Sequence, residues 1–452
     1  MRDDVNFRLA MDSNALILAG ELPGAPPSWE RLGEQLPLEW IEQALDYTGR
    51  ASIRKRRLPA EQVVWFVIGL ALYRHKSVRQ LVGELDLALP DLADRCVSDS
   101  AVTQARQRLG EEPLEHLFNV TAQHWKNEAA KDSHFQHLAL FAMDGTSLRL
   151  ADSPANRAHF GSSSFPQQGT GSHPLVRMVT LNALSTQMVV AARFGPYEIG
   201  EMTHAKLMMS EIPDHSLTIF DRGFLAGELL HTLGQTGQAR HFLVPAKANT
   251  KWTIVEGTDA DAIVEMKISP TARKSNPELP ATWRARAIRG EDFDGKTSYV
   301  LTSLIDRRAF PAASVRACYR RRWQIETSYR ELKQSMMGMA LSLRSHDVAT
   351  TRQEIWGILI AYNLVRLEMA RAAREAKCAP TEISFIMALH AYQFEMMHAK
   401  TLQSLGTVPA VIKRMRERIL VELNVYRPGR IFDRVAKAKA QRYPERRLRK
   451  TA

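Results

Sequence analysis

The chain of 452 residues carries 61 Lys and Arg against 49 Asp and Glu, which gives a net charge of +12 and a pI near 9.7. This length predicts about three domains, and the positive charge favours a polyanionic partner such as nucleic acid. Three cysteines without paired spacing argue against a disulfide scaffold or a cysteine zinc site and fit a reducing cytoplasm, and the apolar runs at 63–73 and 355–365 are too short to cross a membrane.

The first 130 residues predict a helical domain. Pro59 suits the first turn of a helix that continues through 63–73, and a second helix begins near Ser77. Ser98-Asp-Ser100 predicts the cap of a third helix at 101–109, which would expose Arg106 and Arg108. Three short helices ending in one with exposed Arg and Gln are typical of a helix-turn-helix DNA-binding domain. An ordinary helical domain with a solvated basic face would give the same pattern.

Two short apolar runs each end in an aspartate with a glycine close behind it. The run at 137–146 carries Asp144 followed by Gly145, and the run at 216–224 carries Asp221. Continuous apolar runs of this length predict strands buried on both faces, and the glycine predicts that each strand ends there. A single aspartate at a strand end is also typical of the first residue of a turn.

The segments around these runs predict further strands and helices. A hairpin at 174–194 and a helix at 201–212 lead into the Asp221 strand, and a helix at 225–233 precedes a strand at 241–245. Between about 249 and 300 the chain holds more β-like sequence than one helix and one strand need. We therefore expect a β-rich insertion there.

The segment from Tyr319 to Lys333 has no Gly or Pro and predicts a helix. Tyr319, Arg322, Glu326 and Lys333 are 3, 4 and 7 residues apart, so at about 100° per residue they share a stripe roughly 60° wide. An exposed helix with charge pairs gives a similar stripe, but here the basic residues outnumber what one carboxylate needs. Glu326 with the two aspartates would make the oxygen-ligand set that Mg²⁺ takes.

These residues carry a family resemblance. Asp144, Asp221 and Glu326, with the spacing Tyr-x2-Arg-x3-Glu-x6-Lys, resemble the DDE-class transposases of bacterial insertion sequences, in the group typified by insertion sequence four. The resemblance runs through most of the chain. It implies an α+β, RNase H-like core in which three antiparallel strands precede strands that alternate with helices. In that fold the first and fourth strands are neighbours, and the helix bearing Glu326 packs against the sheet.

The resemblance also implies an activity and its site. The chain would be a DNA transposase that moves its insertion sequence by cut and paste, cleaving and joining double-stranded DNA at terminal inverted repeats. Asp144, Asp221 and Glu326 would hold two Mg²⁺ ions, for which Mn²⁺ can substitute. DNA phosphates would meet Tyr319, Arg322 and Lys333, and a flipped base would stack on Trp283 or Tyr299 of the insertion. Two DNA ends imply a homodimer in the synaptic complex, located in the bacterial cytoplasm at the nucleoid.

The predicted organisation has three parts. They are a helical DNA-binding domain at 1–130, an RNase H-like catalytic domain at 131–375 with its insertion at about 249–300, and a helical, basic C-terminal region at 376–452. The basic stretch at 427–450 fits a solvated chain end as well as a DNA contact. Two other functions stay open: an RNase H-fold nuclease that only hydrolyses, and a non-catalytic DNA-binding protein from a decayed element.

Overall fold

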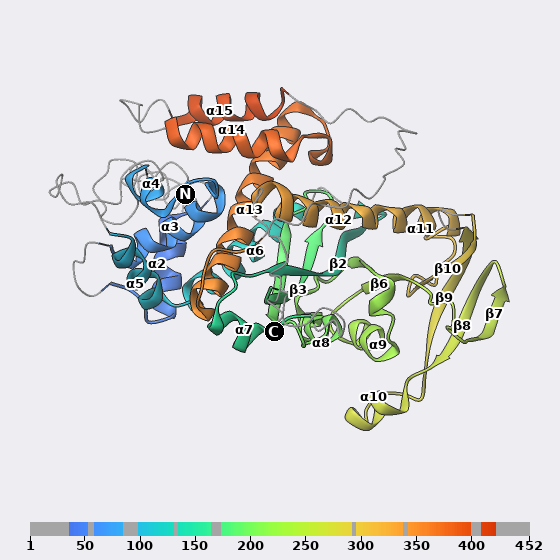
Figure 1. Ribbon diagram of the computed structural model, residues 1–452. Coiled ribbons are helices and arrows are strands. Elements are labelled where there is room, and N and C mark those ends of the chain that lie inside the picture. Colours follow the sequence, from blue (N-terminus) through green and yellow to red (C-terminus); the bar gives the residue numbers. More distant parts are fainter. Residues whose placement is uncertain are drawn as a thin grey trace, which may run out of the picture.

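A long, twisted mixed β-sheet runs through the molecule, with helices on both of its faces and a helical block at one end (Figure 1). The computed structural model describes residues 36–52, 58–84, 98–130, 134–163, 173–291, 295–337, 342–398 and 408–421. Cys96 and the basic stretch at 427–450 lie outside these ranges. Within them, no helix is long and apolar enough to span a membrane.

The central part of the sheet has the strand order β4-β3-β2-β5-β6. Three strands pair antiparallel, with the short β1 (His134–Phe135) added to the first of them: β2 (Leu138–Arg149), β3 (Leu175–Ala183) and β4 (Val189–Pro196). The next two, β5 (Ser216–Phe220) and β6 (Arg240–Pro245), run parallel to β2. This is the order of an RNase H-like core, so the first and fourth long strands, β2 and β5, are neighbours as the resemblance implied.

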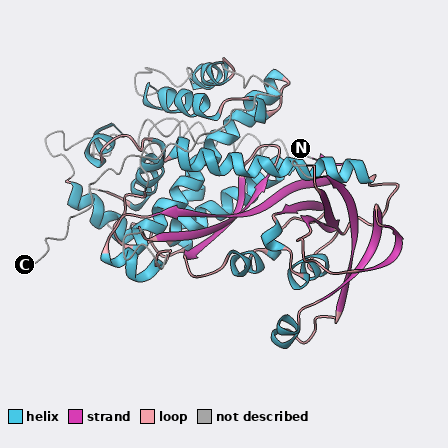
Figure 2. Ribbon diagram, turned by 45° about the vertical axis from the view of Figure 1, so that its right-hand side comes forward, coloured by secondary structure: helices cyan, strands magenta, loops and turns pink. Residues whose placement is uncertain are grey.

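Both faces of the central sheet are buried, which explains why its strands are continuously apolar. Leu140 and Ala142 of β2 pack into one core, and Phe141 and Met143 pack into the other. The first core lies under α11 (Ala312–Tyr319), α12 (Trp323–Arg330) and α13 (Val348–Ala376). The second lies under α8 (Glu201–Leu207) and α9 (Gly227–Gln235), on the opposite face (Figure 2).

The β-rich insertion continues the central sheet and does not form a separate unit. Its strands are β7 (Thr253–Thr258), β8 (Asp261–Lys267), β9 (Thr282–Glu291) and β10 (Thr297–Thr302), with α10 (Pro270–Ser275) between the second and third. β10 pairs antiparallel with β6, through Leu301 opposite Val244. The order therefore runs on from β6 through β10, β9 and β8 to β7, whose residues are exposed.

The N-terminal helices pack directly on α13. They are α2 (Leu38–Tyr47), α3 (Ala60–Leu72), α4 (Val78–Glu84), α5 (Asp99–Leu109) and α6 (Glu112–Ala130). Gly357 lets α3 and α13 approach closely, because a Cβ there would lie 2.8 Å from the Val67 side chain and 3.0 Å from its carbonyl oxygen. The buried residues of these helices join those of α13 in one hydrophobic core. The remaining helices, α7 (Pro154–Phe160), α14 (Phe385–His398) and α15 (Val408–Ile419), complete the fold.

Candidate active site

Asp144 and Asp221 come from the two neighbouring parallel strands of the central sheet. Met143 of β2 is in register with Phe220 of β5, so the aspartate that follows each of them sits beside the other. β5 ends before Asp221, as predicted. The prediction that Gly145 ends the other strand is wrong, since β2 continues to Arg149. Gly145 instead makes room for a further acid, because a Cβ there would lie 2.2 Å from the Glu201 Cδ.

The segment from Tyr319 to Lys333 is helical, but it is not one uniform α-helix. α11 ends at Tyr319 and a 3₁₀ turn follows at Arg320–Arg322. After α12 comes a π-helical segment, Glu331–Met336, that contains Lys333. Short 3₁₀ and π segments inside helices often mark functional sites. The four predicted residues nevertheless face the same site, because Arg322 pairs with Glu326 and the charges of Asp144 or Asp221 affect the pKa of Tyr319, Arg322 and Lys333.

Arg322 lies between two of the three predicted catalytic carboxylates. Its Nη2 donates a hydrogen bond of 2.6 Å to Oε1 of Glu326, and its Nη1 is 3.6 Å from Oδ2 of Asp144. The side chains of Arg322 and Asp144 are each 17% exposed. Burial alone would lower the pKa of Arg322, but Tyr319 and the carboxylates of Glu326, Asp221 and Asp144 raise it. The guanidinium therefore supplies positive charge where the three carboxylates converge.

Burial strongly affects the protonation of Asp144. It raises the pKa of this carboxyl to about 6, opposed by the Gly145 N–H and reinforced by the charge of Asp221. The Gly145 N–H donates to Oδ1 of Asp144 at 2.7 Å. Burial of Lys333 lowers its pKa, and the negative charge of Asp144 opposes that shift. Burial of Tyr319 raises its pKa. A cation placed among these groups would favour the ionised form of Asp144.

Tyr329 ties the Glu326 helix to the Asp144 strand, and the sequence patterns did not single it out. Its hydroxyl donates a hydrogen bond of 2.5 Å to the main-chain carbonyl of Asp144 and lies 2.9 Å from Oγ1 of Thr180. Tyr329 is 7% exposed. It follows Glu326 by three residues, almost one helical turn, so the helical spacing placed it on the neighbouring face of the same helix. Sequence alone had no means of showing what that face contacts.

A pocket of about 280 Å³ opens beside Asp221. Its wall combines cationic and aromatic side chains, among them Tyr299, Tyr319, Arg320, Arg322 and Trp323. Trp323 is 56% exposed. The Tyr299 hydroxyl donates to Asp259 at 2.8 Å, and its ring meets the edge of Trp252 at 5.2 Å between centroids. Of the two aromatics predicted to meet a flipped base, Tyr299 therefore lines the site.

Trp283, the other predicted stacking residue, is part of the hydrophobic core under β6. It is 7% exposed and packs against Phe242, with ring centroids 5.8 Å apart. The indole also lies close to the start of α9, since a Cβ on Gly227 would lie 2.5 Å from Nε1 of Trp283. This burial leaves the indole no open face for a DNA base, so the structure gives Trp283 a packing role in place of the expected stacking role.

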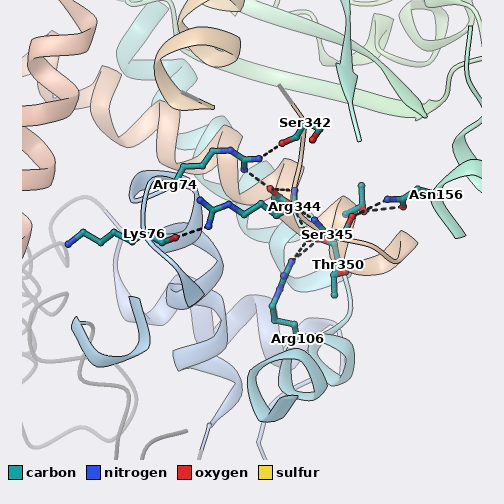
Figure 3. A network of polar contacts seen from close by, with 10 residues as sticks. Arg74, Lys76, Arg106, Asn156, Ser342, Arg344, Ser345 and Thr350 are labelled. Carbon is teal, nitrogen blue, oxygen red and sulfur yellow. Dashed lines mark hydrogen bonds and ion pairs between the residues drawn. The ribbon is translucent and has the colours of Figure 1, made fainter. Parts of the chain in front are cut away.

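Arg106 and Arg108 lie on α5 but have different surroundings. Arg106 points into the protein (Figure 3), where it donates hydrogen bonds of 2.8 Å to the Thr350 carbonyl and 3.1 Å to the Ser345 hydroxyl. Burial lowers the pKa of Arg106. The predicted exposure of Arg106 is therefore wrong, because its guanidinium joins the N-terminal helices to α13. Arg108 is exposed and lines a pocket of about 510 Å³ together with Arg50.

The three carboxylates have the right chemistry for a hard cation, although they are not arranged as a closed site. Within the described ranges, no three His, Cys, Asp or Glu side chains come together in the arrangement of a preformed metal site. Asp144 and Glu326 instead share Arg322, which takes up the charge that a cation would neutralise. Carboxylate oxygens are the ligands that Mg²⁺ prefers. The donor set therefore fits a divalent metal ion that replaces the arginine contact.

Comparison with known proteins gives a consistent answer over the length of the chain. Residues 26–119 match the family model for the insertion element 4 transposase N-terminal region, and residues 136–364 match the transposase DDE domain. The transposase InsG for insertion sequence element IS4 of Escherichia coli (strain K12) is 36% identical over 422 residues, which cover 91% of this chain and 93% of that protein. The putative transposase InsZ of the same strain is 37% identical over 232 residues, covering 51% of this chain and 76% of that protein.

One solved structure is similar at a much greater distance. The piggyBac transposase synaptic complex with hairpin DNA aligns with 88% of this chain and 86% of that chain, at 11% sequence identity and a TM-score of 0.39. The two family models and the two Escherichia coli proteins carry the assignment of the chain.

Proposed function

The chain belongs to the DDE transposases of the insertion element 4 group, and from this premise we propose that Asp144, Asp221 and Glu326 form its catalytic site. It is a DNA transposase, an enzyme that cleaves DNA strands and transfers the ends of its insertion sequence to new DNA. The single observation that carries the proposed site is that the charges of all three carboxylates act on Arg322. Asp144 and Asp221 follow paired residues of neighbouring strands, and Arg322 links Asp144 to Glu326.

The three carboxylates would hold divalent metal, and we propose two Mg²⁺ ions, with Mn²⁺ as a substitute. When bound, such ions activate the attacking hydroxyl and stabilise the leaving oxygen of a phosphodiester. Asp144 would hold metal together with Asp221, which follows the neighbouring strand, and with Glu326, which shares Arg322 with it. Tyr329 holds that helix against β2, which keeps Glu326 within reach of the same site.

Arg322, Lys333 and Tyr319 would grip DNA phosphates at the site. The guanidinium of Arg322, which pairs with Asp144 and Glu326 in this structure, would bind a phosphate through two parallel hydrogen bonds. Lys333 acts as a point charge, and the Tyr319 hydroxyl can donate to a phosphate oxygen. Tyr299 is the insertion residue that we propose for stacking on a flipped base, because it lines the pocket beside Asp221.

Recognition of the terminal inverted repeats would use the N-terminal helices. Arg108 is the proposed DNA contact of α5, since Arg106 is engaged within the protein. Two ends must be held at once, so we propose a homodimer in the synaptic complex. The reaction would take place in the bacterial cytoplasm, at the nucleoid.

The function is tested by incubating the purified protein with the inverted-repeat DNA that flanks its gene and with Mg²⁺, and by resolving the products on a denaturing gel. We expect a nick, then a hairpin, and then joined products when target DNA is added. Asp144→Ala, Asp221→Ala and Glu326→Gln should abolish cleavage and retain end binding, because affinity depends mainly on phosphate contacts. Near-normal cleavage by one variant would remove that residue from the site. Hydrolysis without joined products would favour the nuclease alternative.

A further inference from the structure

A second basic pocket lies beside the signature helix, the segment from Tyr319 to Lys333, and it shares no residue with the pocket beside Asp221. It encloses about 390 Å³ between the 3₁₀ turn that precedes α12, the last turns of α13 and the turn after β3. We name it the α12–α13 pocket. The residues that matter for its chemistry are Arg321, Gln324, Ala370, Ala373, Arg374 and Lys377. None of these residues lines the pocket beside Asp221.

Three consecutive arginines are divided between the two pockets. Arg320 and Arg322 line the pocket beside Asp221, whereas Arg321 lines the α12–α13 pocket. The 3₁₀ turn at Arg320–Arg322 has about three residues per turn, so neighbouring side chains point about 120° apart. One turn of the signature helix thus presents cations to the catalytic pocket and to a second pocket at the same time.

The composition of the α12–α13 pocket suits a sugar-phosphate backbone. Ala370 and Ala373 are 6% and 1% exposed and form an apolar floor, where small side chains leave the hollow. Arg321, Arg374 and Lys377 bring three positive charges to it, and among the described residues that line it none is acidic. Deoxyribose can lie on an apolar floor, and phosphate oxygens accept hydrogen bonds from arginine and lysine.

The end of α13 accounts for part of this charge. Cations in the last turn of a helix stabilise its C-terminal dipole, and Arg374 and Lys377 occupy such positions. That effect explains neither the hollow nor Arg321, which comes from another helix.

We propose that the α12–α13 pocket binds a backbone phosphate of double-stranded DNA, apart from the phosphate at the catalytic carboxylates. This inference rests on the proposed function, since it assumes a DNA substrate. The DNA is either a second segment of the transposon end or the target duplex, which present the same phosphate chemistry. A site on the signature helix itself would hold the bound DNA in a fixed position relative to Glu326.

The test compares a pocket variant with a matched control. The pocket variant is Arg374→Gln with Lys377→Asn, because Lys377 has a φ of 55° and asparagine tolerates that conformation. The control is Arg273→Gln with Lys274→Asn, which removes two exposed cations from the last turn of α10. Binding of an inverted-repeat duplex and of an unrelated target duplex is measured against salt concentration. Melting temperatures establish that both variants are folded.

We expect the pocket variant to lower the slope of log affinity against log salt by about 1 to 2 for one of the two duplexes, with a smaller change in the control. The duplex that responds identifies the DNA bound there. Slopes equal to those of the control for both duplexes would overturn the proposal, as would a variant that changes only the oligomeric state, which would assign the pocket to a second protein copy. Nicking of inverted-repeat DNA by the unmodified protein tests the proposed function separately.

Discussion

The Tyr329 hydroxyl donates a hydrogen bond of 2.5 Å to the main-chain carbonyl of Asp144. This bond joins α12, which carries Glu326, to β2, which carries Asp144. It involves neither carboxylate, yet it sets how far one lies from the other. Groups that share metal ions must be held to within a fraction of an ångström. A buried hydrogen bond of this kind therefore helps to fix the positions of the two elements that carry the carboxylates.

Tyr329→Phe should raise the Mg²⁺ concentration needed for half-maximal nicking severalfold. The variant keeps the ring and loses the contacts of the hydroxyl with the Asp144 carbonyl and Thr180, worth about 1 kcal/mol each, so the fold should persist while the helix carrying Glu326 becomes less well placed. Mn²⁺ binding, followed by electron paramagnetic resonance, should weaken in parallel. Tyr47→Phe is the control, because Tyr47 is 78% exposed. An unchanged metal requirement would show that Tyr329 does not position the site.

Asp144→Asn should stabilise the metal-free protein at neutral pH. Burial raises the pKa of Asp144 to about 6, above the ordinary value of 3.8. The folded state therefore binds more protons than the unfolded state between pH 4 and 6, and the free energy of unfolding falls as pH rises through that range. The loss is complete above pH 6 and amounts to about 3 kcal/mol. Melting temperatures in EDTA should favour the variant at pH 7.5 and converge at pH 4.

Two further results would complete the test of Asp144. Adding Mg²⁺ at pH 7.5 should raise the melting temperature of the unmodified protein more than that of Asp144→Asn, because the carboxylate is the proposed ligand. A difference between the two proteins that stays constant from pH 4 to pH 7.5 would contradict the assignment of a raised pKa to this residue.

Arg322→Ala and Lys333→Ala should differ in how metal affects DNA binding. Without metal, Arg322 is engaged by Glu326 and Asp144, so its removal should change the salt dependence of end binding little. With Ca²⁺ on the carboxylates the guanidinium is released, and the same variant should lower the salt slope by about one. Lys333→Ala should lower it by about one under both conditions. An Arg322 effect that ignores metal would refute competition between the guanidinium and the cation.

Trp283→Ala and Tyr299→Ala should separate packing from a role in the reaction. Trp283 is buried against Phe242, so its truncation should cost about 3–5 kcal/mol of stability. Tyr299 lines the site pocket, and its truncation should slow hairpin formation more than nicking, since a stacked base is worth about 1–3 kcal/mol. The measurements are thermal unfolding and the ratio of nicked to hairpin product. A wild-type ratio in Tyr299→Ala would end the stacking proposal.

Arg106→Ala and Arg108→Ala form a matched pair on one helix. Arg106 donates to Ser345 and Thr350, so its loss leaves buried acceptors unpaired and should lower stability by about 1–3 kcal/mol. Arg108 is exposed, and its loss should instead reduce the preference for terminal-repeat DNA over scrambled DNA. Competition binding and melting temperature separate the two effects. An undiminished preference in Arg108→Ala would move end recognition to another part of the chain.

Local sequence predicted the elements of the site better than it predicted their contacts. The apolar run before Asp221 and the helix bearing Glu326 follow from composition and spacing alone. The end of β2 does not follow from the sequence, because a glycine such as Gly145 can either end a strand or make room for a neighbouring side chain. Here the side chain of Glu201 lies against Gly145, and the strand continues. The neighbourhood of β2 and β5 came from the family resemblance.

Long-range contacts account for the other differences between prediction and structure. The inward direction of Arg106 depends on Thr350, which is 244 residues away in the chain. Helical spacing predicts which residues share a face of a helix, but it does not predict which other part of the protein that face contacts. The same holds for Trp283 and Tyr299, which look alike on their strand-like runs. Their different exposure arises because Trp283 lies against Phe242 of β6, whereas Tyr299 lies at the pocket beside Asp221.

The hydrogen bonds between β10 and β6 make the insertion and the catalytic core one continuous sheet. An insertion that has its own hydrophobic core can be replaced without damage to the domain that surrounds it. Here no such boundary exists, because removing the four strands would leave the backbone of Leu243, Val244 and Pro245 as an open sheet edge. Replacing the insertion therefore requires a new strand that pairs with β6.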